Sequence, residues 1–479
     1  MLAEQATASA RNEPLAPYAV DRAPSPAAYA WCRTLPYDGV PAQIQHQALR
    51  CLVDLAGVAA AGAHTRLAAI ARRVALVQFG SAPAGKGARL FFADGRVAAP
   101  AAAMANAGTL DSYDAHDGHA LTKGHAGASV LPALIAAADL QGQAIDGRTF
   151  LATLVAGYEV ALRAGIALHA TAADYHSSGA WSALGAAAVT ARVLGLDDAQ
   201  GREALGIAEY HGPRAPMMRC IDHPTMVKDS AMWGAHSGVT AALLAAEGFT
   251  GAPAALVEDA AVAQVWNDLG TRWRMLEQYF KPYPVCRWAQ PAIQAAFALR
   301  AEHGFDAAQI DSVEVATFAE ACRLGGTIPV DTEQAQYNLV YPLACALVRG
   351  RVGAAEIAED SLRDPALGAL MQRTRFVDDA GASARFPAER IARLTLRLRD
   401  GRVLTTVSET TLGDPQQPLA DAQVDAKARA ALETQIGVAP AARLLERLWN
   451  LAAEADALDV LAPLLRAPTR ASAGCKLSG

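Results

Sequence analysis

The chain has 479 residues, of which 52% are hydrophobic and 19% are charged, so it can bury a sizeable core and is too apolar to be disordered. A formal net charge of −6 argues against a general nucleic-acid-binding protein, because no basic surplus exists to displace counterions from phosphates. The seven cysteines are scattered without a Cys-x-x-Cys pair, which indicates reduced thiols and neither a disulfide framework nor a zinc site.

Residues 1–26 are predicted to form a loose N-terminal tail. This stretch is rich in alanine and proline, and it lacks the basic start and long apolar run of a signal peptide. Elsewhere the apolar runs are alanine-rich and interrupted, so we expect no membrane-spanning segment. These features together favour a cytoplasmic protein with neither a membrane nor a nucleic acid as its partner.

Helical periodicity dominates the chain from about Tyr18 to Tyr279. Apolar residues recur at helical spacing over 43–62, 67–79, 98–110, 128–140, 149–168, 180–194 and 231–247. Many of these faces are alanine, which has high helix propensity and lets neighbouring helices approach closely. The first half of the chain is therefore predicted to be a packed helical domain.

The pattern changes after Tyr279. Residues 311–318 alternate with period two, as a strand does, and two further strands over 391–399 and 402–410 flank the hairpin signal Asp400-Gly401. Residues 338–348 are predicted to be helical between them. From about Pro418 the pattern is helical again, with 442–465 as its clearest helix.

The predicted fold class is mainly α with an α+β second domain. We expect one large helical domain formed from both ends of the chain, residues 27–278 and 416–479. A smaller α+β lid domain, residues 279–415, is inserted into it and falls within the usual size range of a domain. A cleft between the two domains is the expected ligand site.

Four predicted helices are preceded by basic or titratable side chains. Lys123 and His125 come before the helix at 128, His176 before 180, Lys228 before 231, and Lys281 and Arg287 before 291. A helix N-terminus has free N–H groups and a partial positive charge, so a cation there is mildly unfavourable for the helix itself. Each residue alone could be structural or a surface side chain, but the repetition indicates anion sites. A small molecule with several carboxylates is the expected ligand.

The segment from Asp111 to His125 contains three carboxylates and three imidazoles within fifteen positions. One interpretation is a polar loop, in which Asp and Gly form turns. Another is a metal site made by His116, Asp117, His119 and His125, although the His-x-x-His spacing is not that of a standard zinc helix. The interpretation that we favour is acid/base catalysis combined with anion binding, without a metal. No phosphate-binding, dinucleotide-binding or Gly-x-Ser-x-Gly motif is present, so no cofactor is expected.

An ordered set of segments resembles the MmgE/PrpD family. Its members include 2-methylcitrate dehydratase, cis-aconitate decarboxylase and iminodisuccinate epimerase. The matching stretches are 110–114 (LDSYD), 125–132 (HAGASVLP), 157–160 (GYEV), 176–185 (HSSGAWSALG), 227–228 with 235–238, 281–288 (KPYPVCRW), 336–344 and 413–415. The resemblance implies a helical domain with a smaller α+β lid, a homodimer, and metal-free chemistry on small polycarboxylates.

The resemblance also places an active site on this chain. Its family positions fall on Asp111, His125, His176, Lys228, Lys281 and Tyr341. We assign catalysis to Asp111, His125, His176 and Tyr341, and substrate binding to Lys228, Lys281, Arg287, Lys123 and His119. Ala115 replaces the family's threonine, and Gln290 stands where a histidine is common. These departures argue against a straightforward 2-methylcitrate dehydratase.

The predicted function is a metal-independent lyase, either a dehydratase or a decarboxylase, acting on a small di- or tricarboxylic acid. One histidine, His125 or His176, serves as acid or base, Asp111 orients the imidazole, and Tyr341 delivers a proton to the opposite face. The alternative is an epimerase that moves an α-proton in the same pocket. Further alternatives are a metal-dependent hydrolase and an inactive carboxylate-binding protein.

Overall fold

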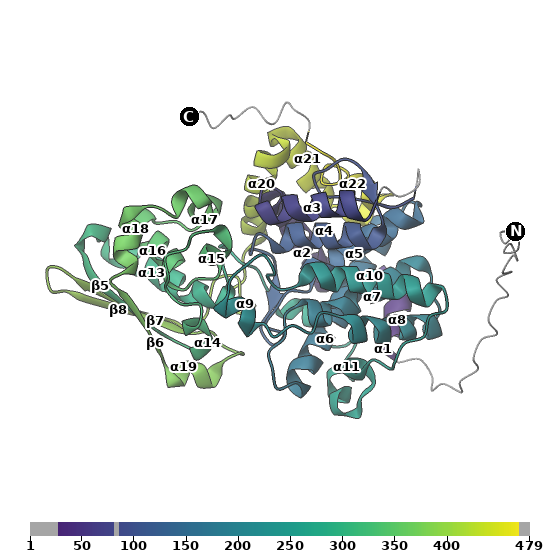
Figure 1. Ribbon diagram of the computed structural model, residues 1–479, viewed down its shortest axis with the longest axis horizontal. Coiled ribbons are helices and arrows are strands. Elements are labelled where there is room, and N and C mark those ends of the chain that lie inside the picture. The colour runs from purple at the N-terminus through teal and green to yellow at the C-terminus, as the bar shows by residue number, and fades with distance from the viewer. Residues whose placement is uncertain (1–26, 81–85, 469–479) are drawn as a thin grey trace, which may run out of the picture.

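The computed structural model describes residues 27–80 and 86–468, which form two lobes side by side (Figure 1). The tail predicted for residues 1–26 lies outside the described residues. The larger lobe is helical, whereas the smaller lobe combines a four-stranded sheet with helices. The predicted fold class, mainly α with an α+β second domain, is confirmed.

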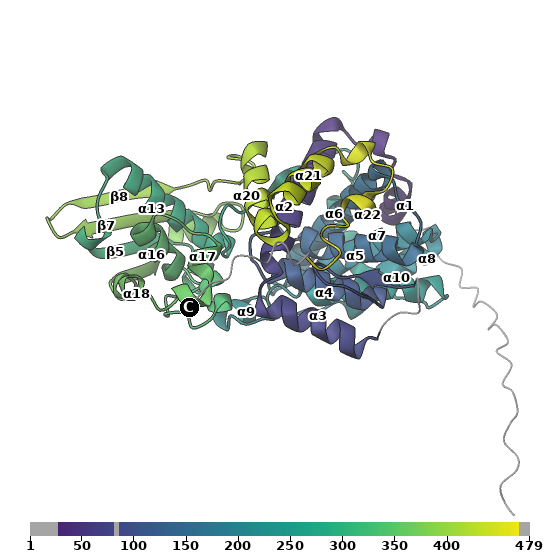
Figure 2. The ribbon, with the colours of Figure 1, turned by 90° about the horizontal axis from the view of Figure 1, so that it is seen from above.

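The helical domain takes elements from both ends of the chain. Its helices are α1 (Ala27–Thr34), α2 (Ala42–Gly62), α3 (Arg66–Gln78), α4 (Ala99–Asp111), α5 (Gly127–Gln141), α6 (Gly147–Thr171), α7 (Gly179–Leu194), α8 (Asp198–His211), α9 (Met218–Asp222), α10 (Ala231–Ala246), α11 (Ala255–Glu258), α12 (Ala263–Trp266), α20 (Asp421–Ile436), α21 (Val438–Trp449) and α22 (Ala457–Val460). Helix α20 packs along α2 (Figure 2), so the C-terminal segment completes the core begun at the N-terminus.

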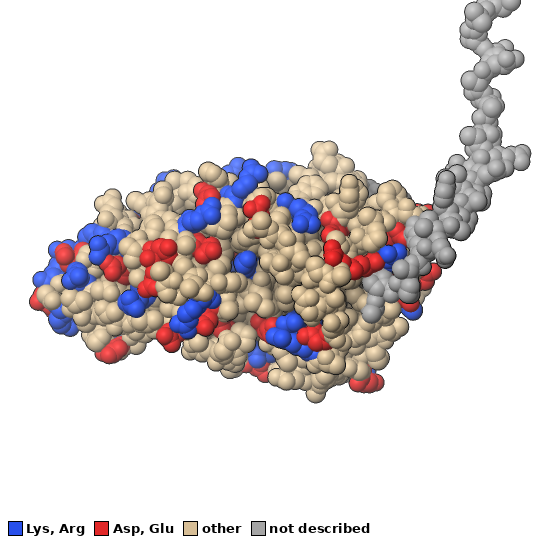
Figure 3. Space-filling view, turned by 90° about the horizontal axis from the view of Figure 1, so that it is seen from below, with Lys and Arg blue, Asp and Glu red and all other residues tan. Residues whose placement is uncertain are grey.

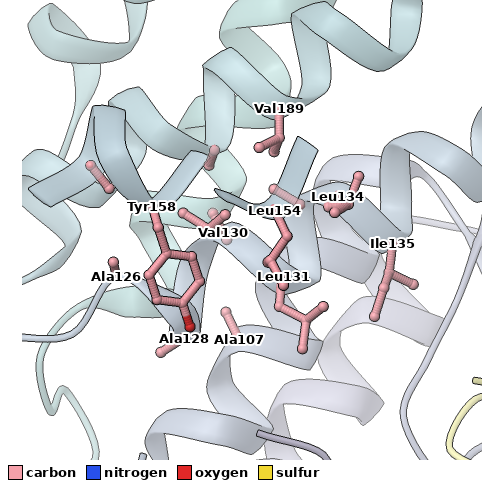
Figure 4. Close-up of a cluster of buried hydrophobic side chains, with 14 of the residues drawn as sticks. Ala107, Ala126, Ala128, Val130, Leu131, Leu134, Ile135, Leu154, Tyr158 and Val189 are labelled. Carbon is pink, nitrogen blue, oxygen red and sulfur yellow. The ribbon is translucent and has the colours of Figure 1, made fainter. Parts of the chain in front are cut away.

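Small residues let the central helices approach closely. Helices α5, α6 and α7 contribute Val130, Leu154, Tyr158 and Val189 to one buried cluster (Figure 4). A Cβ atom on Gly157 would lie 2.3 Å from Val189 Cγ1, so only glycine fits at this contact. The alanine- and glycine-rich faces seen in the sequence therefore correspond to close helix packing.

Helix α6 is long and apolar enough to span a membrane by length and composition alone. However, 94% of its most apolar window is buried inside the protein. Its apolar surface is covered by neighbouring helices, among them α5 and α7, as is usual for a core helix.

The α+β domain is built on a sheet with the strand order β6–β5–β7–β8. The strands are β5 (Ile310–Thr317), β6 (Thr374–Asp378), β7 (Ala392–Leu398) and β8 (Val403–Ser408), and only the β5–β6 pair is parallel. Its helices are α13 (Gln290–His303), α14 (Ala319–Cys322), α15 (Thr332–Gln336), α16 (Val340–Arg349), α17 (Ala354–Ile357), α18 (Pro365–Met371) and α19 (Ala380–Arg385). The predicted strand at 311–318 and the hairpin are confirmed, and Gly401 adopts φ 91° in the hairpin turn.

Two separate hydrophobic cores underlie the two lobes. The first contains residues from Ala28 to Phe280 and from Leu419 to Leu465, and the second contains residues from Val285 to Leu404. Helix α9 and the residue before it are the exception, because Met217, Cys220 and Ile221 belong to the second core. The chain thus crosses between the lobes at more places than the two predicted boundaries.

Two two-stranded pairs complete the fold. Strands β1 (Ala88–Arg89) and β2 (Arg96–Val97) pair with each other. Strand β3 (Gly118–His119) pairs with β4 (Gln278–Tyr279), which lies where the chain leaves the helical domain. The β3–β4 pair fixes the titratable loop after α4 against the entry to the α+β domain.

The single helix predicted over 442–465 is wrong. Helix α21 ends at Trp449, and α22 does not begin until Ala457. Between them the backbone turns toward the start of α6, where Gly147 donates to the Glu454 carbonyl and Ala457 donates to the Ile145 carbonyl. Asp456 then caps α22 by accepting from Leu458. Tertiary hydrogen bonds therefore override helix propensity in this segment.

Charges of both signs are interspersed on the surface. Figure 3 shows Lys and Arg next to Asp and Glu over the face seen from below, with wide uncharged areas over the helical lobe. This face has no large region of a single sign, in keeping with the small net charge of the chain.

Candidate active site

A small cavity of about 20 Å³ lies where the two cores meet. This is room for roughly one water molecule. Its ionisable lining residues are Asp114, Lys123, His125, Asp229, Lys281 and Arg287, and its aromatic ones are Tyr175, Tyr279, Trp288 and Tyr337. The cavity therefore brings together four of the predicted site residues, Lys123, His125, Lys281 and Arg287.

A larger cavity, of about 830 Å³, lies between α2, α3, α17 and α20. Its walls are mainly alanine, glycine and proline, and its Lys427 is already bonded to Asp54 and to the Ala115 carbonyl. Because it has no cluster of titratable groups comparable to that of the smaller cavity, we place the chemistry in the smaller one.

The four helix starts singled out in the sequence have no side-chain cap at α5, α7, α10 or α13. At α10 the first N–H is instead satisfied by a carboxylate, because Ala231 N donates to Asp111 Oδ2 at 3.3 Å. Asp111 is the last residue of α4 and is buried. One of the predicted anion sites is therefore filled by the protein's own carboxylate.

Asp111 was predicted to orient the imidazole of the acid/base histidine, His125 or His176. The histidine beside it in the structure is His116. His116 Nε2 is 3.4 Å from Asp111 Oδ1, and both side chains are buried. Burial raises the pKa of Asp111 to about 6, although Lys228 and His125 oppose the rise. Burial, together with Lys281, lowers the pKa of His116 to about 3. His116 is therefore neutral near pH 7.

His125 is held by three contacts. Its Nδ1 lies 2.6 Å from the Asp117 carbonyl oxygen, its backbone N–H donates to Ser178 Oγ at 3.0 Å, and its Nε2 is 3.2 Å from Asp229 Oδ2. The His116 ring packs against it with centroids 4.1 Å apart. Burial, His116 and Lys281 lower the pKa of His125 well below its usual value, so the ring is neutral near pH 7.

Two predicted lysines are buried close to His125. Lys281 Nζ donates to Asp114 Oδ1 at 2.5 Å. Lys228 Nζ donates to Gln336 Oε1 at 2.6 Å and lies 4.7 Å from the centre of the Tyr337 ring. Lys281 thus has a carboxylate partner, whereas the partner of Lys228 is neutral.

Arg287, predicted to bind substrate, is bonded to several acceptors of the protein itself. Its guanidinium donates to Asp414 Oδ1 at 2.5 Å and to the carbonyls of Thr411 and Leu412 at 3.1 Å. Gln290 takes a further bond at 2.8 Å. Arg287 therefore ties down the segment through which the chain returns to the helical domain, although it also borders the cavity.

Lys123 and the unpredicted Arg390 each lie over an aromatic ring that lines the cavity. Lys123 Nζ is 4.9 Å from the centre of the Tyr175 ring, and Arg390 Cζ is 5.4 Å from that of Tyr279. Burial lowers the pKa of Lys123. Within residues 27–80 and 86–468, no carboxylate lies within 4.0 Å of Lys123, Lys228 or Arg390.

Besides Asp111 and Lys228, three further predicted residues do not line the cavity. His176 is partly exposed, and its Nδ1 contacts the Asp174 carbonyl at 2.8 Å. Tyr341 is in the second core and donates from its hydroxyl to the Glu356 carbonyl at 2.6 Å. His119 Nε2 contacts Glu277 Oε2 at 3.1 Å. None of these three side chains lines the cavity, although the charge of Arg390 adds to burial in lowering the pKa of His119.

A cation site is possible in geometry but disfavoured by charge. Ligand atoms of Asp114, His116 and His125 lie within 4.8 Å of one another. Asp117 and His119 from the predicted metal set point elsewhere, to Gln278 and Glu277. Asp114 is bonded to the Lys281 ammonium. Burial is the main cause of the lowered pKa values of His116 and His125, and the positive charge of Lys281 lowers them further. A metal ion would have to displace or face this ammonium.

The sequence interpretation missed Asp229, Tyr337, Gln336 and Arg390. Asp229 directly follows Lys228, and Gln336 and Tyr337 begin the matching stretch 336–344. These three residues could therefore have been selected from the sequence. Arg390 precedes a predicted strand with no motif around it. Its position beside the cavity depends on the fold of the α+β domain.

Two family models cover most of the chain. The MmgE/PrpD N-terminal domain matches residues 28–272, and the MmgE/PrpD C-terminal domain matches residues 283–452. The chain belongs to the MmgE/PrpD family. The resemblance stated from the sequence is thereby confirmed.

Curated relatives are distant. The chain is 24% identical to the cis-aconitate decarboxylase-like protein oryM of Aspergillus oryzae over 76% of this chain and 81% of that protein. It is 23% identical to a cis-aconitate decarboxylase of Aspergillus terreus over 91% of this chain and 94% of that protein. Family and relatives together support an enzyme of the lyase type.

Proposed function

We propose that this protein is a metal-independent lyase that removes carbon dioxide or water from a small di- or tricarboxylic acid. The observation that supports this proposal is a set of three cations, Lys123, Lys228 and Arg390, that have no carboxylate within 4.0 Å among the described residues. The first lines the cavity, and the other two lie over the rings of Tyr337 and Tyr279, which line it. An anion with several carboxylates would supply the missing counter-charges.

The burial of the cations supports this assignment. Lys228 and Arg390 are buried at 1% and 5% exposure, so their attraction for a carboxylate is screened far less than at the surface. Pairing the substrate's carboxylates with these cations would also lower the cost of further negative charge on a neighbouring carbon. Both decarboxylation and dehydration next to a carboxylate create such charge in the transition state.

His125 is the proposed acid/base residue. Its neutral ring has the Nδ1 proton directed to the Asp117 carbonyl, so Nε2 carries a lone pair toward the cavity. We no longer propose His176 and Tyr341 for catalysis, because their polar atoms are engaged outside the cavity. His119 and Arg287 are likewise replaced by Arg390 among the proposed substrate-binding residues.

Entry of the substrate requires the two domains to separate. A cavity of about 20 Å³ holds roughly one water, which is much smaller than a dicarboxylate. Because its walls come from both cores, a small rotation of the α+β domain would open it. This closed arrangement would exclude water during the reaction.

We also propose a cytoplasmic homodimer. Large apolar side chains on and after α3, Val77 and Phe79, and Trp233 on α10 are 67%, 40% and 52% exposed. The Phe79 and Trp233 rings both contact the His236 ring, so they form one continuous patch. Light scattering after size-exclusion chromatography tests this, and a monomer at micromolar concentration would contradict it.

The proposed activity is tested by incubating the protein with a panel of di- and tricarboxylic acids in deuterated water. Proton and carbon NMR follow each substrate. Loss of one carboxylate carbon with a new C–D bond indicates decarboxylation, and a new olefinic signal with all carbons retained indicates dehydration. Either result supports the proposal.

Two results would overturn it. Deuterium entering at an α-carbon without net product would identify an epimerase. No turnover of any acid in the panel, combined with thermal stabilisation by one of them, would identify a carboxylate-binding protein without lyase activity.

A further inference from the structure

Asp229 occupies an unusual position beside His125. It is 2% exposed, and it lies in the short connection between α9 and α10. The residues on both sides have left-handed backbones without being glycine, Lys228 at φ 47° and Ser230 at φ 58°. Such conformations cost free energy and persist where the surrounding structure holds them. Here the Asp229 carbonyl accepts from Gly179 N at 3.0 Å, which fixes the turn.

The two oxygens of Asp229 have different surroundings. Oδ2 lies 3.2 Å from His125 Nε2. Oδ1 is buried and has no hydrogen-bond partner of good geometry among the described residues, although the Ser178 hydroxyl is near enough to oppose the rise of the Asp229 pKa on burial. The side chain also lines the cavity. Asp229 is therefore a buried carboxyl. Its Oδ2 contacts His125, the proposed base, and its Oδ1 can accept a further hydrogen bond.

The hydrogen bonds of His125 decide how many protons this pair holds. A carbonyl oxygen can only accept, so the 2.6 Å contact with the Asp117 carbonyl requires a proton on Nδ1. In a neutral ring Nε2 then has only a lone pair. A favourable contact between Nε2 and Asp229 Oδ2 needs one proton between them. At 3.2 Å the two atoms are close enough to hold a single proton between them, which would belong either to the imidazole or to the carboxyl.

The neighbours of the pair favour the carboxyl. Burial, followed by the charges of Asp111 and Asp114, raises the pKa of Asp229 well above its usual value, although Lys281 opposes this. Burial lowers the pKa of His125. The other titratable groups that interact with Asp229 are Tyr175, Tyr337, Cys220 and Cys286, with Lys228 next to it in the chain. Near pH 7 the shared proton is thus on Asp229.

We propose that Asp229 is a catalytic residue, the acid that gives its Oδ2 proton to the substrate. This inference rests on the proposed lyase activity. In a decarboxylation, the bond to the departing carboxylate breaks, carbon dioxide leaves, and the electron pair left on carbon takes the Asp229 proton. The Asp229 carboxylate regains a proton from solvent when the site opens.

In a dehydration the same pair completes a cycle by itself. His125 Nε2 removes the hydrogen next to the carboxylate as a proton, and the electron pair left on carbon forms the double bond. The hydroxyl leaves with the Asp229 proton as water. The proton then on Nε2 returns across the 3.2 Å contact to Asp229 Oδ2, and both groups recover their starting state.

The test compares Asp229→Asn with the wild type. An asparagine amide can still donate to Nε2 and hold the ring, but it has no proton to transfer. We expect kcat to fall by about 100-fold or more, the usual range for loss of an acid, with KM within about threefold. Asp174→Asn, which changes an exposed carboxylate before Tyr175, is the matched control and should retain wild-type turnover.

A second readout does not depend on turnover. In protein with ¹⁵N-labelled histidine, we expect His125 to show a protonated Nδ1 and a bare Nε2 at pH 7 in both the wild type and Asp229→Asn. Asp229→Ala should shift the Nε2 signal, because the donor is lost. An imidazolium, or a bare Nδ1, in the wild type would overturn the inference.

The two proposals can fail separately. Turnover by the wild type and by Asp229→Asn at similar rates would refute the role of Asp229 and leave the lyase function intact. A wild type inactive on the whole panel would refute the lyase function and, with it, this role for Asp229, whatever proton arrangement the nitrogen spectra show.

Discussion

Lys281 Nζ lies 2.5 Å from Asp114 Oδ1, and the two side chains are 1% and 2% exposed. Burial alone would raise the pKa of Asp114, but the Lys281 ammonium brings it below its ordinary value. The pair joins the loop after α4 to the segment that leads into the α+β domain. It therefore connects the two domains at the edge of the cavity and sets the charge around His116 and His125.

Removing one member of this pair should cost more stability than removing both. Lys281→Met leaves an unpaired buried carboxylate, and Asp114→Asn leaves an unpaired ammonium, so each should lower the free energy of unfolding by about 3 kcal/mol or more. The double variant should lose much less than the sum of the two. Urea unfolding of the four proteins measures this coupling.

Strictly additive losses would contradict a buried ion pair. Lys86→Met, at an exposed lysine, is the matched control for the loss of a lysine and should change the free energy of unfolding by no more than about 0.5 kcal/mol.

Lys228 should matter for turnover. Its ammonium is bonded to the neutral Gln336 amide, so the proposed substrate would be its counter-ion. We expect Lys228→Met to lower kcat/KM by about 100-fold, which corresponds to about 2.7 kcal/mol of lost transition-state stabilisation. Steady-state kinetics on the acid identified by NMR provide the measurement. A variant that keeps its wild-type kcat/KM would remove Lys228 from substrate binding.

Much of the fold was predictable because it follows local rules. The helices from α2 to α7 and the β7–β8 hairpin follow apolar periodicity and turn chemistry, which depend on near neighbours in the chain. The break between α21 and α22 was not predictable in this way. It depends on two hydrogen bonds with the start of α6, some 300 residues earlier: the Glu454 carbonyl accepts from Gly147, and Ala457 N–H donates to the Ile145 carbonyl.

Some residues of the candidate site were likewise predictable from local sequence, and others depend on the tertiary fold. His125, Lys228 and Lys281 could be selected from their places at helix starts and from the family motifs. The sequence could not predict which carboxylate contacts His125. Asp111 and Asp229 are both near this histidine, and the positions of α4 and α10 decide which of the two lies against it. Tyr341 in α16 matched a motif, yet Tyr337, four residues earlier at the end of α15, lines the cavity.

Metal removal should leave the activity unchanged. The one group of described side chains that could hold a metal here, Asp114, His116 and His125, includes a carboxylate already bonded to Lys281. We expect elemental analysis of the purified protein to find no stoichiometric zinc, manganese or iron. Dialysis against a chelator should leave kcat within about twofold of its starting value, which is much less than the loss expected when a catalytic ion is removed. Activity that disappears with the chelator and returns with one metal would contradict the proposal.

Asp117 should make stability depend on pH. Burial, and then the nearby Asp54, raise the pKa of Asp117 from 3.8 to about 7, so the folded protein keeps a proton that the unfolded chain releases. Its contribution to stability is complete below pH 4 and is lost as the pH rises toward 7. Between pH 5 and 6.5 the free energy of unfolding of the wild type, relative to Asp117→Asn, should fall by about 1.4 kcal/mol per pH unit.

Chemical denaturation at several pH values checks this slope. Burial also raises the pKa of Glu159 to about 7, but that residue is present in both proteins, so its effect cancels in the difference. Asp174→Asn serves as the control, because its exposed carboxylate should give a profile parallel to that of the wild type. If the Asp117→Asn profile is also parallel, Asp117 is ionised in the folded protein. The hydrogen bond that its carboxyl accepts from Gln278 then belongs to a buried charge.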